Sequence, residues 1–499
     1  MTSYLKLAVL FVGVFALALA GCQGTEQKPQ STDQKTTGPA SADNAKPAEK
    51  PPAPSTIKYE IYDPKDKNKV LATFEIKTTP ISLRGQHISG GPVLISSDSR
   101  RCATVLKDEN GKQYVSLDGK KCGAGAPSDP ANWAFSPDSK RFAYAAKVGD
   151  AWVIVMDGAS SPAKGIVKRI FFSEDSTRFG YIARSGEEAK VEPGQAGVMK
   201  VGPPIQEWLV IDGKETAKYD AVWPPSFSPD GKHTAFIARS QDKMYVVMDG
   251  VDGNPYESIL TDLGVRFSPD GKNVMFVAGP KAEERLVISG TVHPEFNGMP
   301  VFSQDGKRAA YIGRFGEKTK ILVDAYPKKP DGGKTFDYRR ASDVVFSPDS
   351  QHYAFVARRN DHTTTYVLDG KEGGTFEGTR PAVVEFSPDS KRLTFVLTQD
   401  NGNEIVVVDG AKGKEHKPVH YSRDVFSISF VEHPFFSPDS KRVAYAAETD
   451  DGKGLVVLDD YDIPVGAKIV SAIVFDSPTS LHAIGIAGDS IVSIEIEIK

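Results

Sequence analysis

The sequence predicts an all-β protein, and within that class a β-propeller built from four-stranded blades. A short motif recurs along the chain, the segments between its copies alternate like strands, and no segment after residue 56 has a helical period. The clearest copies read Phe-Ser-Pro-Asp followed by Ser or Gly, and they stand at 135–140, 227–232, 267–272, 346–350, 386–391 and 436–441. Weaker copies stand at 95–98, 172–175, 302–305 and 475–478.

The spacing of these copies matches the size of a propeller blade. From Asp98 to Asp476 the mean period is about 42 residues, and roughly 40–45 residues are typical of one blade. A four-stranded blade exposes apolar surface on both faces, so neighbouring blades must stack to bury it. We predict about 8–10 blades and favour one large ring. Two smaller propellers, separated at 185–206 or at 414–433, are the alternative.

Each unit contains the signals of four strands in order. Phe ends the first strand, and Ser-Pro-Asp-Ser/Gly supplies the turn, because Pro fixes φ and Gly accepts a positive φ. The second strand is an apolar run such as 234–239, and the third is a β-branched run such as 244–248 that an Asp-Gly turn closes. A fourth strand, such as 256–260, leads to the next Phe.

The last unit, 473–498, lacks a fourth strand in this pattern. Two extra strand-like segments, 57–62 and 70–76, precede the first unit. We predict that they supply the missing strand and so close the ring by joining the two ends of the propeller.

Residues 1–21 predict a lipoprotein signal peptide. An apolar run at 7–20 follows Lys6 and is too short to span a membrane comfortably, as in the core of a signal peptide. Leu19-Ala20-Gly21-Cys22 resembles the bacterial lipobox. That resemblance implies cleavage before Cys22 and lipidation of this residue.

Residues 22–56 predict a disordered tether, because they are rich in Pro, Ala and Lys and almost free of large apolar residues. We therefore predict that residues 57–499 form the propeller. Gln23 follows the lipidated Cys22, and the absence of Asp there implies the outer membrane of a two-membrane bacterium. We expect a lipid-anchored protein of the cell envelope that faces the periplasm or the cell surface.

The two remaining cysteines, Cys102 and Cys122, flank one hairpin of the first unit. An exported protein meets an oxidising compartment, so the pair is a candidate disulfide. The alternative is two small buried strand residues, because strict hairpin pairing sets Cys102 nearer Leu117 than Cys122.

The two edges of the predicted ring differ in sequence. The turns after strands one and three are short and nearly identical, which indicates a structural role for their aspartates. The connections after strands two and four vary in length, as functional loops do. A basic residue recurs where strand two ends: Lys147, Arg184, Arg239, Arg314 and Arg358. These cations predict an acidic ligand or partner, and solvated charges that guard strand ends are the alternative.

The sequence contains none of the common hydrolase, metalloprotease, nucleotide-binding or Cys-x-x-Cys motifs. His416 and His420 have a metal-ligand spacing, but Pro418 between them argues against the helix that this spacing needs. We therefore predict no catalytic residue, no cofactor and no metal. A net charge of −4 gives no electrostatic case for binding nucleic acid.

The repeated Phe-Ser-Pro-Asp-Ser/Gly-Lys and Val-Val-x-Asp-Gly pattern resembles the TolB-type, WD-like propeller repeat of bacterial envelope proteins over residues 92–499. This resemblance implies a propeller that acts by binding protein partners. We expect a non-catalytic scaffold that binds an envelope protein or an anionic envelope polymer through its variable loops. An enzyme or binding protein for acidic carbohydrate, and a passive structural module, are the alternatives.

Overall fold

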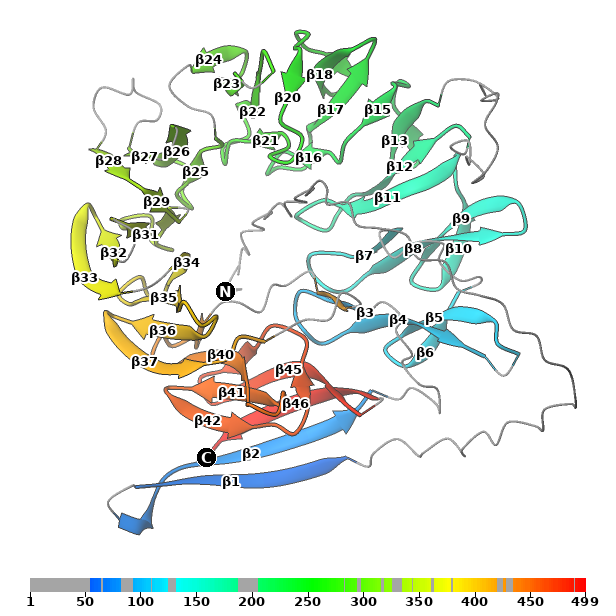
Figure 1. Ribbon diagram of the computed structural model, residues 1–499. Helices are drawn as coiled ribbons and strands as arrows, with labels where there is room; N and C mark the ends of the chain where they lie inside the picture. Colours follow the sequence, from blue (N-terminus) through cyan, green and yellow to red (C-terminus); the bar gives the residue numbers. More distant parts are fainter. Residues whose placement is uncertain are drawn as a thin grey trace, which may run out of the picture. The chain divides into compact units, whose positions relative to one another are not determined.

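Ten β-sheets follow one another along the chain, and each is a blade of a single ring (Figure 1). The computed structural model describes residues 54–499 except 64–65, 82–92, 109, 124–131, 187–204, 282, 294–297, 316–317, 325–333, 343, 360–362, 378–379, 420–424, 428–433 and 489. The predicted all-β propeller with one ring is confirmed, and the alternative of two smaller propellers is wrong.

The first five blades are built from these strands. Blade 1 holds β3 (Val93–Ile95), β4 (Cys102–Lys107), β5 (Gln113–Leu117) and β6 (Lys120–Cys122). Blade 2 holds β7 (Trp133–Phe135), β8 (Phe142–Val148), β9 (Ala151–Met156) and β10 (Ala159–Pro162), and blade 3 holds β11 (Ile166–Phe172), β12 (Phe179–Arg184), β13 (Glu207–Ile211) and β14 (Lys214–Glu215). Blade 4 holds β15 (Ala221–Val222), β16 (Ser226–Phe227), β17 (Thr234–Ser240), β18 (Lys243–Met248) and β19 (Val251–Asp252). Blade 5 holds β20 (Ser258–Ile259), β21 (Arg266–Phe267), β22 (Val274–Gly279), β23 (Arg285–Ile288) and β24 (Thr291–His293).

The remaining blades follow in the same way. Blade 6 holds β25 (Val301–Phe302), β26 (Ala309–Phe315), β27 (Lys318–Val323) and β28 (Lys334–Tyr338), and blade 7 holds β29 (Arg340–Ala341), β30 (Val345–Phe346), β31 (Tyr353–Arg358), β32 (Thr363–Leu368) and β33 (Lys371–Glu377). Blade 8 holds β34 (Arg380–Phe386), β35 (Leu393–Thr398), β36 (Glu404–Val408) and β37 (Ala411–His416). Blade 9 holds β39 (Phe435–Phe436), β40 (Val443–Glu448), β41 (Gly454–Leu458) and β42 (Tyr461–Pro464). Blade 10 holds β43 (Lys468–Ile469), β44 (Val474–Ser477), β45 (Ser480–Ala487) and β46 (Ser490–Ile498).

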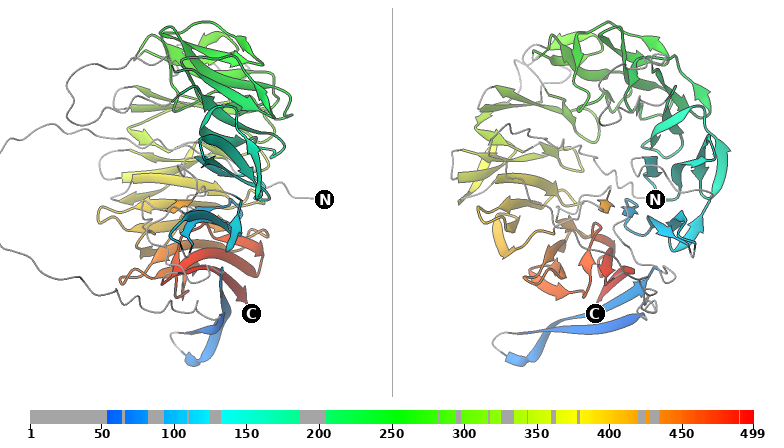
Figure 2. Two further views of the ribbon diagram at one scale, coloured as in Figure 1. Left: turned by 90° about the vertical axis from the view of Figure 1, so that its right-hand side faces the viewer. Right: turned by 45° about the vertical axis from the view of Figure 1, so that its right-hand side comes forward.

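Consecutive strands of each blade pair antiparallel, with the first strand on the inner side of the ring (Figures 1 and 2). In blades 4, 5, 7 and 10 two short strands share that inner position, and both pair with the second strand. The turns after strands one and three therefore lie on one edge of the ring, which we name the constant face. The connections after strands two and four lie on the opposite edge, the variable face.

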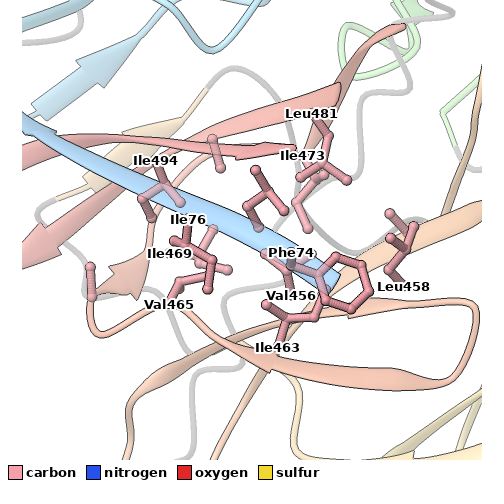
Figure 3. Packing of buried hydrophobic residues seen from close by; sticks show 14 of the residues in the cluster. Phe74, Ile76, Val456, Leu458, Ile463, Val465, Ile469, Ile473, Leu481 and Ile494 are labelled. Atoms are coloured by element: carbon pink, nitrogen blue, oxygen red, sulfur yellow. The ribbon is translucent and has the colours of Figure 1, made fainter. Parts of the chain in front are cut away.

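The N-terminal strands close the ring, as predicted. Strand β2 (Asp66–Pro80) pairs antiparallel with β46, from Phe74 opposite Ile498 to Pro80 opposite Val492, and β1 (Ser55–Asp63) pairs with β2 in turn. Figure 3 shows Phe74 and Ile76 packed against apolar residues of blades 9 and 10. Both are 1% exposed, and each buried side chain of this size contributes roughly 1.5–3 kcal/mol through apolar burial.

The core lies in the seams between blades, because the two faces of every blade serve different neighbours. In β31, Tyr353 and Phe355 pack toward blade 6 in one apolar cluster. Ala354 and Val356 lie between them in sequence and pack toward blade 8 in another cluster. This is the alternation that a strand imposes when both of its faces are buried.

One segment leaves this order. Strand β38 (Val425–Ser427), from the connection between blades 8 and 9, pairs parallel with the inner strand β3 of blade 1 (Figure 2). Val93 lies opposite Val425 in this pairing. No helix within the described residues has the length and apolar character needed to cross a membrane.

Candidate functional site

The constant face is a set of local turns. In blade 4 the Ser228 hydroxyl donates to Asp230 Oδ1 at 2.6 Å, and the backbone N–H of Lys232 donates to the same oxygen at 3.2 Å. The hydroxyl of Ser228 holds the pKa of Asp230 at about 2. The Asp-Gly turns have a positive φ at both residues, for example 49° at Asp249 and 83° at Gly250, which is the type I′ geometry of a tight hairpin.

The basic residue after the motif contacts the Asp of its own blade, and in blades 1, 3, 6 and 8 it also donates to the next blade. Arg392 Nε donates to Asp409 at 2.8 Å. Its Nη1 donates to the carbonyl oxygens of Ser440 at 3.1 Å and Lys441 at 2.7 Å in the next blade, and its guanidinium lies 5.3 Å from the centre of the Phe436 ring. Ion pairs with the Asp of an Asp-Gly turn or its equivalent are also made by Arg101, Arg141, Arg178, Arg308 and Arg442. In blades 4 and 7 the Nδ1 atoms of His233 and His352 lie 2.7 Å from the carboxylate of the corresponding Asp.

The fifth residue of the motif makes a second link. Ser139 has a φ of 60°, and its hydroxyl accepts a hydrogen bond of 3.1 Å from the backbone N–H of Asp98 in blade 1. The same link to the preceding blade is made by Ser176, Ser350, Ser390 and Ser440. The recurring Asp, Ser and Arg of the constant face are thus engaged within the fold, as the sequence predicted for its aspartates.

The variable face carries the five predicted cations at equivalent positions. Each ends or nearly ends the second strand of its blade, and they are Lys147 in β8, Arg184 in β12, Arg239 in β17, Arg314 in β26 and Arg358 in β31. For Arg314 the structure describes only the backbone. Lys147, Arg184 and Arg358 make contacts within the chain. Their role in binding a ligand stays a prediction.

Sequence reasoning missed further cations of this rim, among them Lys107 and Arg340. Lys107 ends β4 and occupies in blade 1 the position that Lys147 occupies in blade 2, but the weak motif copy of blade 1 obscured it. Arg340 begins β29 and lies directly opposite Arg358 in the strand pairing. The two arginines stand 18 residues apart in the sequence, on the first and second strands of one blade, and the strand pairing brings them together.

The predicted disulfide is not formed. Cys102 and Cys122 are free and buried, and they lie in β4 and β6, with β5 between them. Cys102 packs in the seam toward blade 10, whereas Cys122 packs toward blade 2. Burial raises the pKa of Cys102 to about 12 and also raises the pKa of Cys122, so both thiols are held in the unreactive protonated form.

Two further titratable side chains are His416 and Glu385. His416 is engaged by Asp462, 3.0 Å from its Nε2, and by the Tyr445 hydroxyl, 3.2 Å from its Nδ1. His420 lies outside the described residues. Glu385 on the inner strand β34 is half-buried, and loss of solvation raises its pKa to about 8. Among the described residues, no group of three or more His, Cys, Asp or Glu could hold a metal ion.

Comparison with known proteins adds distant structural likenesses. No family model matches the chain, and no curated protein matches it. A crystal structure of the eukaryotic initiation factor aligns with 16% identity over 76% of this chain and 95% of that one, with a TM-score of 0.41. TolB from Acinetobacter baumannii aligns with 15% identity over 58% and 79%, with a TM-score of 0.24, and the Dos1 propeller with 11% identity over 66% and 92%, with a TM-score of 0.32. The propeller fold itself follows from the sheet topology described above.

Proposed function

We propose that the protein is a non-catalytic binding scaffold of the bacterial cell envelope that takes a protein partner on its variable face. The observation that carries this proposal is the contrast between the two edges of the ring. On the constant face, the recurring aspartates are bonded within their turns, and several of the recurring arginines donate to the next blade. On the variable face, exposed cations recur at equivalent strand ends, as Lys147 and Arg239 do, and charged side chains on loops over a rigid scaffold are typical of binding surfaces.

Lipidation of Cys22 would tether this scaffold to the outer membrane, with 22–56 as the spacer. The test is the Cys22→Ser variant, followed by mass spectrometry of the mature amino terminus and by membrane fractionation. We expect an acylated Cys22 in the wild type and loss of the acyl mass and of membrane association in the variant. An unmodified amino terminus in the wild type would contradict the anchor.

The binding proposal is tested by crosslinking in intact cells, affinity purification and mass spectrometry. The wild type is compared with an Arg239→Glu, Arg314→Glu, Arg358→Glu variant that folds and is exported normally. We expect at least one protein partner to be lost from this variant.

A matched control reverses three exposed charges on the constant face: Lys140→Glu, Lys232→Glu and Lys391→Glu. These lysine side chains are 80%, 77% and 80% exposed. The control therefore changes the net charge by the same amount as the test variant, but on the constant face instead of the variable face. Partners retained by the control and lost from the variable-face variant support the proposal. Identical partners in all three proteins overturn it, and turnover of acidic glycans by the wild type would indicate an enzyme instead.

A further inference from the structure

Blade 10 ends on a long and regular outer strand. Among the described residues, β1 pairs with β2 and with no other strand, and it lies on the outside of the ring (Figures 1 and 2). Its pairing with β2 is regular from Ser55 opposite Thr78 to Ile61 opposite Ala72, and the register shifts only beyond Ile61. A regular edge strand presents backbone N–H and C=O groups to which a further strand can bond.

The outer strands of the other nine blades are poorer acceptors of a further strand. In blades 1–5 and in blade 9 they have only two to four residues, and β10 and β42 contain Pro162 and Pro464. In blade 6, β28 has five residues. The longer β33 and β37 each shift register against the neighbouring strand. Short strands, prolines and bulges prevent association between sheet edges, and residues 55–61 have none of these features.

The sequence of β1 is complementary to itself in the antiparallel direction. When two copies are centred on Tyr59, Ile57 lies opposite Ile61 of the second copy, and Lys58 lies opposite Glu60 of the second copy. Opposite charges and matched apolar residues stabilise directly opposed positions, whereas like charges destabilise them. A centre at Lys58 or at Glu60 instead opposes two lysines or two glutamates. The order of the residues therefore favours the register centred on Tyr59.

One face of this strand pair is apolar. Tyr59 and Ile61 are half-buried and pack against the apolar cluster that blades 9 and 10 share. Ile57 stands two residues before Tyr59, so it projects from the same face, but it is 51% exposed. In the register centred on Tyr59, Ile61 of the second copy covers Ile57. Pairing thus removes exposed apolar surface from both copies, which favours association.

The other face continues a ladder of opposite charges. Where β2 meets β46, Lys77 lies directly opposite Glu495, with 3.4 Å between Nζ and Oε2. Where β1 meets β2, Lys58 lies opposite Glu75. Lys58 also forms an ion pair with Glu60 of its own strand. A second copy places another Glu60 beside Lys58 on the outer side, so the alternation of charge continues across the interface.

We propose that β1 pairs antiparallel with β1 of a second copy of this chain, about a two-fold axis at Tyr59. A two-fold interface uses the same surface on both copies, and the order Ile-Lys-Tyr-Glu-Ile at 57–61 supplies such a surface. A single pair of strands is a small interface, so the dimer is reversible. The pairing uses the outer edge of blade 10 and does not depend on the proposed binding function of the variable face.

The experiment is sedimentation equilibrium of the purified full chain in a density-matched detergent, which removes the contribution of the micelle. We expect a reversible monomer–dimer equilibrium for the wild type. Lys58→Glu places two pairs of like charges in the dimer, so it should weaken dimerisation by about tenfold or more. The matched control is Lys214→Glu, at an exposed lysine of the outer strand β14, which should leave the dimerisation constant within about twofold.

A mixture of two variants tests the register. Glu60→Lys alone should weaken dimerisation as Lys58→Glu does, because it opposes lysines instead of glutamates. An equimolar mixture of the two variants should recover the dimer, because two glutamates of one strand then face two lysines of the other. An effect of either substitution on the fold of its own chain does not produce this recovery.

Circular dichroism and the thermal unfolding midpoint establish that each variant is folded. A wild type that stays monomeric at every soluble concentration overturns the proposal. A dimer that Lys58→Glu leaves unchanged also overturns it, because that dimer forms through another surface. A mixture of the two variants that is no more dimeric than either variant alone overturns the register centred on Tyr59.

Discussion

The arginine after the turn motif is the residue that joins one blade to the next. Arg392 pairs with Asp409 inside its own blade and donates to Ser440 and Lys441 in the following blade. A hydrogen bond to a charged group contributes about 1.5–3 kcal/mol, and the neighbouring aromatic ring adds a cation–π interaction. The residue thus converts a local turn into a contact between blades.

Replacing this arginine tests that role. We expect Arg392→Met to lower the free energy of unfolding by about 1–3 kcal/mol, because the apolar chain length is kept while both carbonyl oxygens lose their donor. The measurement is the urea unfolding midpoint followed by tryptophan fluorescence. Lys391→Met changes the neighbouring exposed lysine and should shift stability by less than about 0.5 kcal/mol. Equal effects of the two variants would show that the contact between blades contributes nothing.

Glu385 gives a prediction of the opposite kind, because its carboxyl group is destabilising when ionised. Burial raises its pKa to about 8, whereas an unfolded glutamate has a pKa of about 4.3. Between these values the folded state binds the proton that the unfolded state releases, so stability falls as pH rises through this window. Glu385→Gln is therefore expected to stabilise the protein by about 1–3 kcal/mol at pH 8 and to have no ionisation effect below pH 4.

Urea midpoints at pH 4 and pH 8 measure this difference. Glu377→Gln, at an exposed glutamate of blade 7, is the control and should change stability by less than about 0.5 kcal/mol at both pH values. A Glu385→Gln variant that is no more stable than the wild type at pH 8 would mean that the carboxylate is solvated in the folded state.

At the scale of the strand, the local sequence pattern was sufficient to predict those elements whose motif recurs in every blade. The turn motif and the Asp-Gly hairpins depend on neighbouring residues, so the sequence predicted both. The disulfide failed because hairpin spacing does not show that Cys102 and Cys122 serve opposite seams. The pairing of Arg340 with Arg358 depends on strand register, which is not visible in a single repeat.

Among the strands, we expect disruption of the closing strand β2 to lower the free energy of unfolding most. Phe74 is 1% exposed and packs between blades 9 and 10, and truncation of a buried Phe to Ala typically costs 3–5 kcal/mol. We expect Phe74→Ala to lower stability by about this amount and to make residues 66–80 sensitive to limited proteolysis. Ile57 in β1 is 51% exposed, so Ile57→Ala is the control and should change stability by less than about 1 kcal/mol. Normal stability of Phe74→Ala would contradict closure by β2.

At the scale of the whole ring, stability is shared among ten seams, because each blade contacts its two neighbours. The seam between blades 1 and 10 closes the ring with its own residues. His482, 2% exposed, lies 2.8 Å from the Asp98 carbonyl oxygen and 2.9 Å from the Asp476 carboxylate, which also pairs with Arg100. Both ends of the propeller thus meet through β-pairing on the outer side and through this polar contact on the constant face.

The repeated turns make the ring as a whole sensitive to acid. A serine hydroxyl donating to the motif carboxylate lowers the pKa of each of these aspartates, to about 2 for Asp230, and they are Asp230, Asp270, Asp305, Asp349, Asp389 and Asp439. A carboxyl group whose pKa is lower in the folded state stabilises the fold above its unfolded pKa of about 3.9. That stabilisation is lost as pH falls through the folded pKa. We therefore expect a thermal midpoint that these groups leave unchanged above pH 5 and that falls steeply between about pH 4 and pH 2.

Differential scanning calorimetry across pH 2–7 measures this dependence, and the Asp230→Asn variant isolates one turn. The variant lacks the titrating group, so its thermal midpoint should be lower than that of the wild type at pH 6. The difference between the two midpoints should narrow as pH approaches 2, because the wild type loses the same charge there. Because the six turns lie in different blades, their losses add around the ring, and the acid transition of the wild type should be steeper than a single carboxyl group would produce. A gap between the two proteins that is as wide at pH 2 as at pH 6 would show that the charge on Asp230 does not stabilise the turn.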